Sequence, residues 1–262
     1  MTESNVTDIV TTAEHENPLA NLPEELQKKI LAASQQIQQS SSVTINKIRL
    51  DAKNYILPDS TETEKFSGII VGIKHANIHY AGEYEEGVTN PPDCIALGDV
   101  PCNDLVPHES VVEKYCTTCA ACPKFQWGSA ARGKGKSCGE HTLLAVYIPS
   151  LGDELYLLEE KKANSKAVDG YLASINNKYG HPVAVLTEFA IGVKNKWEQS
   201  FSATGRTSAE LVTKLVDRFE EANVMLEARV LDAYKRSQTA SDSSTTVEAT
   251  TTDEPVRKAR SR

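Results

Sequence analysis

The chain has 262 residues, of which 40% are hydrophobic and 24% are charged, and its formal net charge is −8. This is the composition of an ordinary globular protein, in one large domain or two small ones. The acidic balance argues against a surface that is basic throughout, so any nucleic-acid site must be local. No run of about 18 apolar residues occurs, so the sequence predicts no membrane span.

The first predicted elements are a helix and two strands. The helix starts at Asn21, whose side chain is a suitable cap, and a proline and two acids follow in the first turn. Strand patterns then cover residues 43–50 and 66–74. Gly68 and Gly72 interrupt the second pattern, and they are candidate positions for a bend or a bulge.

Further strands are predicted beyond residue 140. Apolar, β-branched segments at 142–148 and 155–159 are separated by a turn-like sequence. A short helix is predicted over 165–175. The segments 183–193 and 197–203 are joined by a short Lys-Asn-Lys turn, which predicts a β-hairpin.

The last predicted element is a long amphipathic helix. Thr207 opens a capping box, and the helix is expected to run over residues 207–236. Its apolar residues recur at spacings of three and four, which predicts one face packed on the core: Leu211, Leu215, Phe219, Ala222, Leu226, Val230 and Tyr234.

This order of elements predicts a mainly β fold with flanking helices, organised as an OB-like Greek-key barrel. The predicted domain spans residues 18–236, with a zinc-binding insertion at about 83–141 and the C-terminal helix at its end. Polar composition predicts a disordered arm at 1–17 and a disordered tail at 237–262. A less regular α+β sheet packed on the two end helices is the alternative.

The cysteines carry the clearest chemical signal. All six lie between positions 94 and 138: Cys94, Cys102, Cys116, Cys119, Cys122 and Cys138. Two cysteines three residues apart can bind one metal ion. The chain opens without a charged-then-apolar leader, which predicts a cytoplasmic protein with reduced thiols and argues against disulfides. The motif of the zinc deaminases is missing, because no His-x-Glu precedes the cysteines. A structural Zn²⁺ is therefore expected.

Four cysteines form the predicted ligand set. Cys119 and Cys122 are the strongest pair, because Pro123 stiffens the chain directly after them. Cys138 ends a glycine-containing segment, and Cys94 is expected in a loop. Four other residues remain open as substitutes: Cys116, Cys102, His108 and His141.

A basic segment follows the central cysteines. The chain before it is acidic, since no Lys or Arg occurs between Lys74 and Lys114. Two aromatic and four cationic residues alternate in the basic segment: Lys124, Phe125, Trp127, Arg132, Lys134 and Lys136. Single-stranded nucleic acid is held by this combination, with cations on phosphates and rings on bases. The turn with Lys194, Lys196 and Trp197 is a second candidate surface. Alternatively, Phe125 and Trp127 form a small core beside the metal.

The cysteine segment resembles a group of bacteriophage-encoded single-stranded DNA-binding proteins. The matching pattern is Pro-Asp-Cys94, Cys119-x-x-Cys122-Pro with Trp-Gly-Ser, and Gly-Lys-Gly-Lys-x-Cys138. It is densest over 91–148 and extends to about 204. The resemblance implies a role in phage DNA replication and recombination, with the four predicted cysteines binding zinc and the basic loop facing the strand. It also implies phage or host replication and recombination proteins as partners, in the host cytoplasm.

The leading hypothesis is therefore a sequence-nonspecific, non-enzymatic single-stranded DNA-binding protein with a structural zinc. The second hypothesis is a zinc-stabilised interaction module that regulates host transcription or replication through its acidic segment. An enzyme is the third, and it is disfavoured because the chain offers no clustered carboxylates and no positioned histidine.

Overall fold

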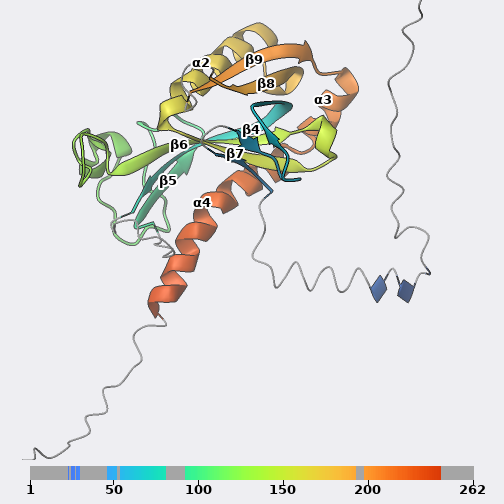
Figure 1. Ribbon diagram of the computed structural model, residues 1–262. Coiled ribbons are helices and arrows are strands. Elements are labelled where there is room, and N and C mark those ends of the chain that lie inside the picture. Colours follow the sequence, from blue (N-terminus) through green and yellow to red (C-terminus); the bar gives the residue numbers. More distant parts are fainter. Residues whose placement is uncertain are drawn as a thin grey trace, which may run out of the picture. The chain divides into compact units, whose positions relative to one another are not determined.

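The computed structural model describes residues 23, 25–26, 28–29, 46–51, 54–80, 92–192 and 198–242 (Figure 1). The chain divides into two units, Met1–Thr44 and Ile45–Arg262. In the first unit, the described residues 25–26 and 28–29 are helical and lie inside the helix predicted from Asn21. The second unit contains every described strand and all six cysteines.

The second unit is built on a sheet of nine strands. Their bounds are β1 Lys47–Leu50, β2 Tyr55–Ile56, β3 Glu62–Thr63, β4 Lys65–His79, β5 Cys94–Gly98, β6 Cys138–Tyr147, β7 Leu155–Lys161, β8 Val185–Ile191 and β9 Gln199–Arg206. The strand order is β3-β2-β1-β7-β6-β4-β8-β9, and β5 also pairs with β4. All pairs are antiparallel except β1 with β7, which is parallel.

Strand β4 is the centre of this sheet. It pairs with β8 near its start, with β6 along most of its length and with β5 at its end. The register to β6 shifts between Ile70 and Gly72, which is the predicted bulge. A Cβ at Gly72 would lie 3.0 Å from the Cβ of Ala222, so glycine here lets the helix above approach the strand. The bulge bends β4 and helps the sheet to curl.

The sheet is curled but open. Among the described residues, β3 and β9 end the strand path and do not pair with each other. A side-chain hydrogen bond links β2 to β9 instead: the Tyr55 hydroxyl donates to Gln199 Oε1 at 2.5 Å. On the neighbouring strands β4 and β8, the opposed Phe66 and Phe189 stack with ring centroids 4.6 Å apart. The architecture is therefore mainly β, with a half-barrel sheet and a few helices.

Helices cover both faces of the sheet. Helix α2 (Lys162–Tyr179) contacts β6, β7 and β9, and it extends beyond the predicted bounds of 165–175. Helix α4 (Phe219–Asp242) contacts β4, β5, β6 and β7 (Figure 1). None of the helices in the described part of the chain is both long and apolar enough to span a bilayer.

The C-terminal helix differs from its prediction in three ways. It is two helices, α3 (Ala209–Val216) and α4, because the chain turns at Asp217 and Arg218. The cap is Ser208 instead of Thr207, since the Ser208 hydroxyl accepts from the backbone N–H of Leu211. Residues 237–242, assigned to the disordered tail, continue α4. The predicted apolar face is confirmed, with its central residues buried in the core.

Glu159 of β7 connects α4 to the sheet. Its carboxylate lies 2.7 Å from Lys47 Nζ, 2.9 Å from Arg229 Nη2 and 2.9 Å from His141 Nδ1, and its side chain is only 7% exposed. Burial raises the pKa of this carboxyl, but the His141 hydrogen bond and the charges of Arg229 and Lys47 outweigh burial. The net result is a pKa well below the usual range, so the folded protein holds Glu159 ionised.

The cysteine segment is partly integrated into the sheet. Cys94, expected in a loop, is the first residue of strand β5, whose residues pair with β4. Residues 138–141, placed at the end of the predicted insertion, begin β6. Between them, 99–137 has two short 3-10 turns, η1 (Cys119–Ala121) and η2 (Pro123–Phe125), and a single β-bridge from Pro107 to Ala96.

Candidate metal site and basic loop

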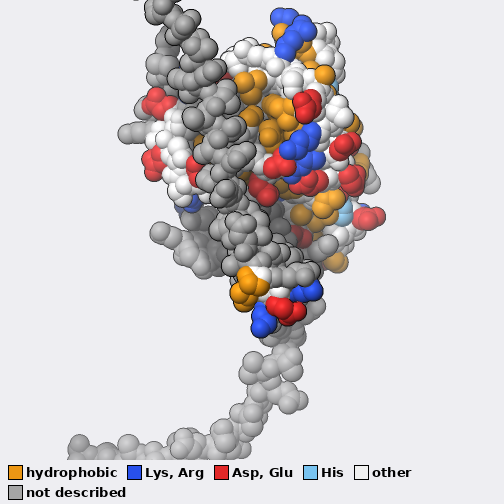
Figure 2. Space-filling view, turned by 90° about the vertical axis from the view of Figure 1, so that its right-hand side faces the viewer, with side chains coloured by type: hydrophobic (Ala, Val, Ile, Leu, Met, Phe, Trp, Pro, Cys, Tyr) orange, Lys and Arg blue, Asp and Glu red, His pale blue; other side chains and the backbone are white. Residues whose placement is uncertain are grey.

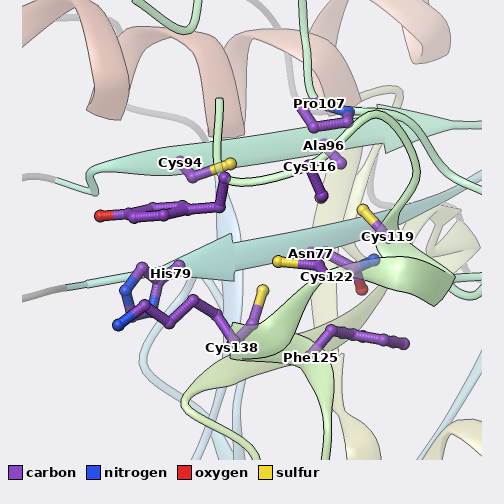
Figure 3. Close-up of a pocket in the computed structure, with 12 residues that line it drawn as sticks. Asn77, His79, Cys94, Ala96, Pro107, Cys116, Cys119, Cys122, Phe125 and Cys138 are labelled. Carbon is purple, nitrogen blue, oxygen red and sulfur yellow. The ribbon is translucent and has the colours of Figure 1, made fainter. Parts of the chain in front are cut away.

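Five of the six cysteines line one pocket at the end of β4, β5 and β6 (Figure 3). The lining residues are Asn77, His79, Cys94, Ala96, Pro107, Tyr115, Cys116, Cys119, Cys122, Lys124, Phe125 and Cys138. The cavity measures about 10 Å³. A single water-sized particle needs about that much space, so the pocket has room for one ion.

Strand register builds one wall of this pocket. Cys94 of β5 lies directly opposite His79 of β4, and Cys138 of β6 lies opposite the same residue on the other side. Directly opposed residues of neighbouring strands point to the same face of a sheet. The pairing therefore brings two cysteines that are distant in sequence to one row.

The η1 and η2 turns build the opposite wall. The N–H of Cys119 donates to the carbonyl of Leu105 at 2.8 Å, and the N–H of Cys122 donates to the carbonyl of Cys119 at 3.1 Å. Pro123 begins η2, which fits its expected stiffening role. Both cysteines are buried although they lie in a loop. Figure 3 shows the sulfur atoms of Cys94, Cys119, Cys122 and Cys138 around one common space.

The thiols in this pocket perturb one another. Burial, followed by the neighbouring Cys119 and Cys122 thiolates, raises the pKa of Cys94 to about 11. Burial, followed by a hydrogen bond with Cys122 and the same thiolates, raises the pKa of Cys116 to about 12. The pKa of Cys138 is raised by burial and by the neighbouring thiolates. Burial also raises the pKa of Cys119, partly offset by a hydrogen bond from Asn77. Several thiolates could coexist here only beside a cation.

The thiols of the pocket are not arranged as the coordination shell of a metal ion. Within the described ranges, no group of three or more His, Cys, Asp or Glu side chains is arranged so that it could hold a metal ion as it stands. A bound metal would have to draw the side chains together. The type of donor fits zinc, because thiolates are its preferred structural ligands.

The four residues named as substitute ligands differ in where they lie relative to the pocket. Cys116 lines the pocket. Cys102 does not, and its sulfur lies 3.9 Å from the carbonyl oxygens of Ala76 and His141. His108 contacts Ser110, and His141 pairs with Glu159. Cys116 is therefore the strongest competitor for the predicted set, while Cys102 packs beside Cys122 and Cys138 without lining the pocket.

The basic loop is ordered by its own backbone. The N–H of Gly128 donates to the carbonyl of Gly135 at 2.9 Å, and the Ser129 hydroxyl donates to the carbonyl of Lys124 at 2.8 Å. Gly128 and Gly133 have φ of +84° and +80°, a conformation that favours glycine. The loop is thus folded back on itself beside the thiol pocket.

Two of the residues predicted to contact DNA are largely buried. Phe125 is only 3% exposed and packs against Cys122 and Cys138, so its ring cannot stack on a base. The Lys136 side chain is only 12% exposed, because its ammonium group pairs with Glu140 and lies 3.5 Å from the centre of the Phe125 ring. Phe125 and Lys136 instead support the pocket. For Phe125 this is the alternative stated above, a small core beside the metal.

The other loop residues reach the surface. Trp127 is 69% exposed, and Arg132 and Lys134 are exposed as well. Lys124 is half-buried, with its Nζ 5.4 Å from the centre of the Tyr115 ring. The second predicted surface, Lys194, Lys196 and Trp197, lies outside the described residues.

Away from the basic loop, the described surface carries both acidic and basic side chains. Figure 2 shows one face on which acidic and basic side chains are interspersed around an apolar area. The described side chains visible there form no continuous basic track. A binding surface for an anionic polymer must therefore be local, as the net charge indicates.

Sequence reasoning missed His79 and Asn77, which line the pocket from β4. Neither residue stands in a recognisable motif, and only the register of β4 with β5 and β6 places them beside the cysteines. Comparisons of the chain with family models, with curated proteins and with solved structures find no match.

Proposed function

We propose that this protein is a non-enzymatic, sequence-nonspecific single-stranded DNA-binding protein, and that a structural zinc in the thiol pocket holds its binding loop. One observation carries the proposal: an ordered loop, adjacent to the pocket, exposes an indole together with cations. Trp127 would stack on a base, while Arg132 and Lys134 would contact phosphates.

The predicted zinc set is Cys94, Cys119, Cys122 and Cys138. These residues support the proposal because they line one pocket with room for a single ion. When bound, the ion would neutralise the thiolates and tie η1 to the sheet. The basic loop begins directly after Cys122 and ends at Cys138, so both of its ends would be fixed.

The wider setting of the proposal is phage DNA replication and recombination, in a host cytoplasm and with replication or recombination proteins as partners. The curled, open sheet supports an OB-like reading of the fold, since OB folds present strands and loops to single strands. The resemblance of the cysteine pattern supports the same setting.

A protein-interaction module is the second candidate. The segment between β5 and η1 exposes Val106 and Val112 next to Glu109 and Glu113. Exposed apolar residues rimmed by charge are typical of protein-binding surfaces. This candidate predicts negligible DNA affinity even at low salt.

The test is a fluorescence-anisotropy titration of a labelled single strand of ~30 nucleotides at two salt concentrations. Trp127→Ala is expected to weaken binding by about 5-fold to 150-fold, the value of one stacked base at about 1–3 kcal/mol. Lys134→Ala is expected to lower the salt slope by about 0.7, because one phosphate contact is lost.

Lys65→Ala is the matched control, since Lys65 lies on β4 and pairs with Glu188 far from the loop along the strand. It should leave affinity and slope unchanged. Wild-type protein that contains zinc but does not bind at low salt would overturn the proposal in favour of the interaction module. Binding that is unaffected by both loop variants would move the site elsewhere.

A further inference from the structure

His79 stands between two cysteines of the pocket. It ends β4, and it lies directly opposite Cys94 on one side and Cys138 on the other. Opposed residues share a face, so the imidazole is flanked by both thiols. Figure 3 shows His79 at the end of its strand, between the strands that carry the two cysteines.

The imidazole is buried with one nitrogen unsatisfied. His79 is 2% exposed, and its Nε2 has no hydrogen-bond partner among the described residues. Its Nδ1 lies 3.3 Å from the carbonyl oxygen of Ser137 and 3.1 Å from the Ser137 hydroxyl. A carbonyl oxygen only accepts, so this contact favours a proton on Nδ1 and a lone pair on Nε2.

This arrangement is typical of a metal ligand. A histidine that binds a metal donates its other ring N–H to a carboxylate or a backbone carbonyl, which fixes the tautomer and the ring orientation. Ser137 supplies such a carbonyl. A buried nitrogen lone pair without a donor is otherwise unfavourable, and a cation in the pocket would satisfy it.

Spacing argues against both strand cysteines binding one ion. Cys94 and Cys138 lie on the two strands that flank β4, so their Cα atoms are separated by about 9–10 Å. This separation is close to the limit for two cysteines on one zinc, because each Zn–S bond is about 2.3 Å and each side chain adds about 3 Å. Cys138 belongs to the small buried cluster with Cys122 and Phe125, while Cys94 belongs to the large apolar cluster that also contains Val111.

We propose that His79 Nε2 is a zinc ligand together with Cys119, Cys122 and Cys138, and that Cys94 is a packing residue. The inference rests on the proposed zinc but changes its ligand set to three sulfurs and one nitrogen. Three of the four cysteines named above are kept.

The test uses the full chain loaded with Zn²⁺ or Co²⁺. His79→Gln is expected to lower zinc affinity, measured by competition with a chromophoric chelator, by more than about 100-fold. Losing a residue that only supports a ligand costs about 10-fold to 100-fold. His108→Gln is the matched control, because His108 contacts Ser110 and does not line the pocket. Cys94→Ser separates the two ligand sets: a packing residue should leave zinc affinity near that of the wild type, whereas a ligand should not.

The cobalt spectrum gives a second readout. His79→Cys supplies a thiolate at the same position, so it is expected to restore affinity and to intensify the thiolate-to-cobalt absorption band. Circular dichroism checks that each variant folds. If His79→Gln does not fold, the zinc affinity and cobalt spectrum of His79→Cys alone decide whether His79 is a ligand.

The outcomes separate the two proposals. Wild-type protein that binds neither metal refutes the zinc itself, and this inference with it. Metal-binding wild type with a His79→Gln loss below 100-fold, or with a cobalt spectrum unchanged in His79→Cys, overturns only the inference. Loss of metal in Cys94→Ser would restore the four-cysteine set.

Discussion

Replacing Cys119 and Cys122 together by serine is expected to abolish zinc binding and to unfold the segment between β5 and β6. Both proposed ligand sets contain these two residues. Zinc binding at structural sites contributes about 10–16 kcal/mol in zinc-finger peptides, and this free energy is also folding free energy. Residues 99–137 have little regular structure of their own. Zinc content should fall from about one per chain to none, and trypsin should cleave at Lys124 and Arg132.

Cys102→Ser is the control for this double variant. Cys102 is a half-buried cysteine of the same segment, but it does not line the pocket. The Cys102→Ser variant should keep its zinc and its resistance to trypsin. A double variant that retained full zinc content would show that the metal, if bound, is held elsewhere.

Replacing Glu159 by glutamine is expected to destabilise the fold by about 1.5–3 kcal/mol, the value of a hydrogen bond to a charged group, because Lys47 and Arg229 are partly exposed and water can hydrate them. The variant removes the charge that faces Lys47, Arg229 and His141 while keeping the side-chain volume. Urea unfolding followed by circular dichroism measures the free energy of unfolding. Glu188→Gln, which breaks a more exposed pair with Lys65, should cost at most about 1 kcal/mol.

The same carboxylate gives stability a defined pH dependence. Its pKa is lower in the folded than in the unfolded chain. Its contribution is therefore fully present above the unfolded pKa, about 4.3, and is lost as pH falls toward the folded pKa. Glu159→Gln should lack this part of the acid destabilisation. Parallel acid profiles of the wild type and the variant would contradict the assignment.

The longer elements were predictable because their periodicity is strong. The β-branched run at 66–74 forms the first two thirds of β4, and the apolar spacing after Leu211 marks the buried face of α3 and α4. Strands β2 and β3 were missed because two residues show no period. The turn at 217–218 was missed because the apolar spacing continues across it.

The site was predictable only in part. Cysteine spacing selected four residues that do line one pocket, because residue type and clustering are visible in a sequence. The position of His79 depends on pairings with residues far along the chain, which no local pattern encodes. The burial of Phe125 likewise depends on its packing against Cys122 and Cys138.

The pairing of β4 with β8 has a consequence for how the protein folds. It joins Lys65 to Ala190, and the parallel pair joins Lys47 to Leu157. Contacts between such distant residues form late, because closing a long loop costs entropy before any contact rewards it. The hairpins β6–β7 and β8–β9 are local and should form first. The row of Cys94, His79 and Cys138 exists only after β4 has joined β5 and β6, so a metal would be captured near the end of folding.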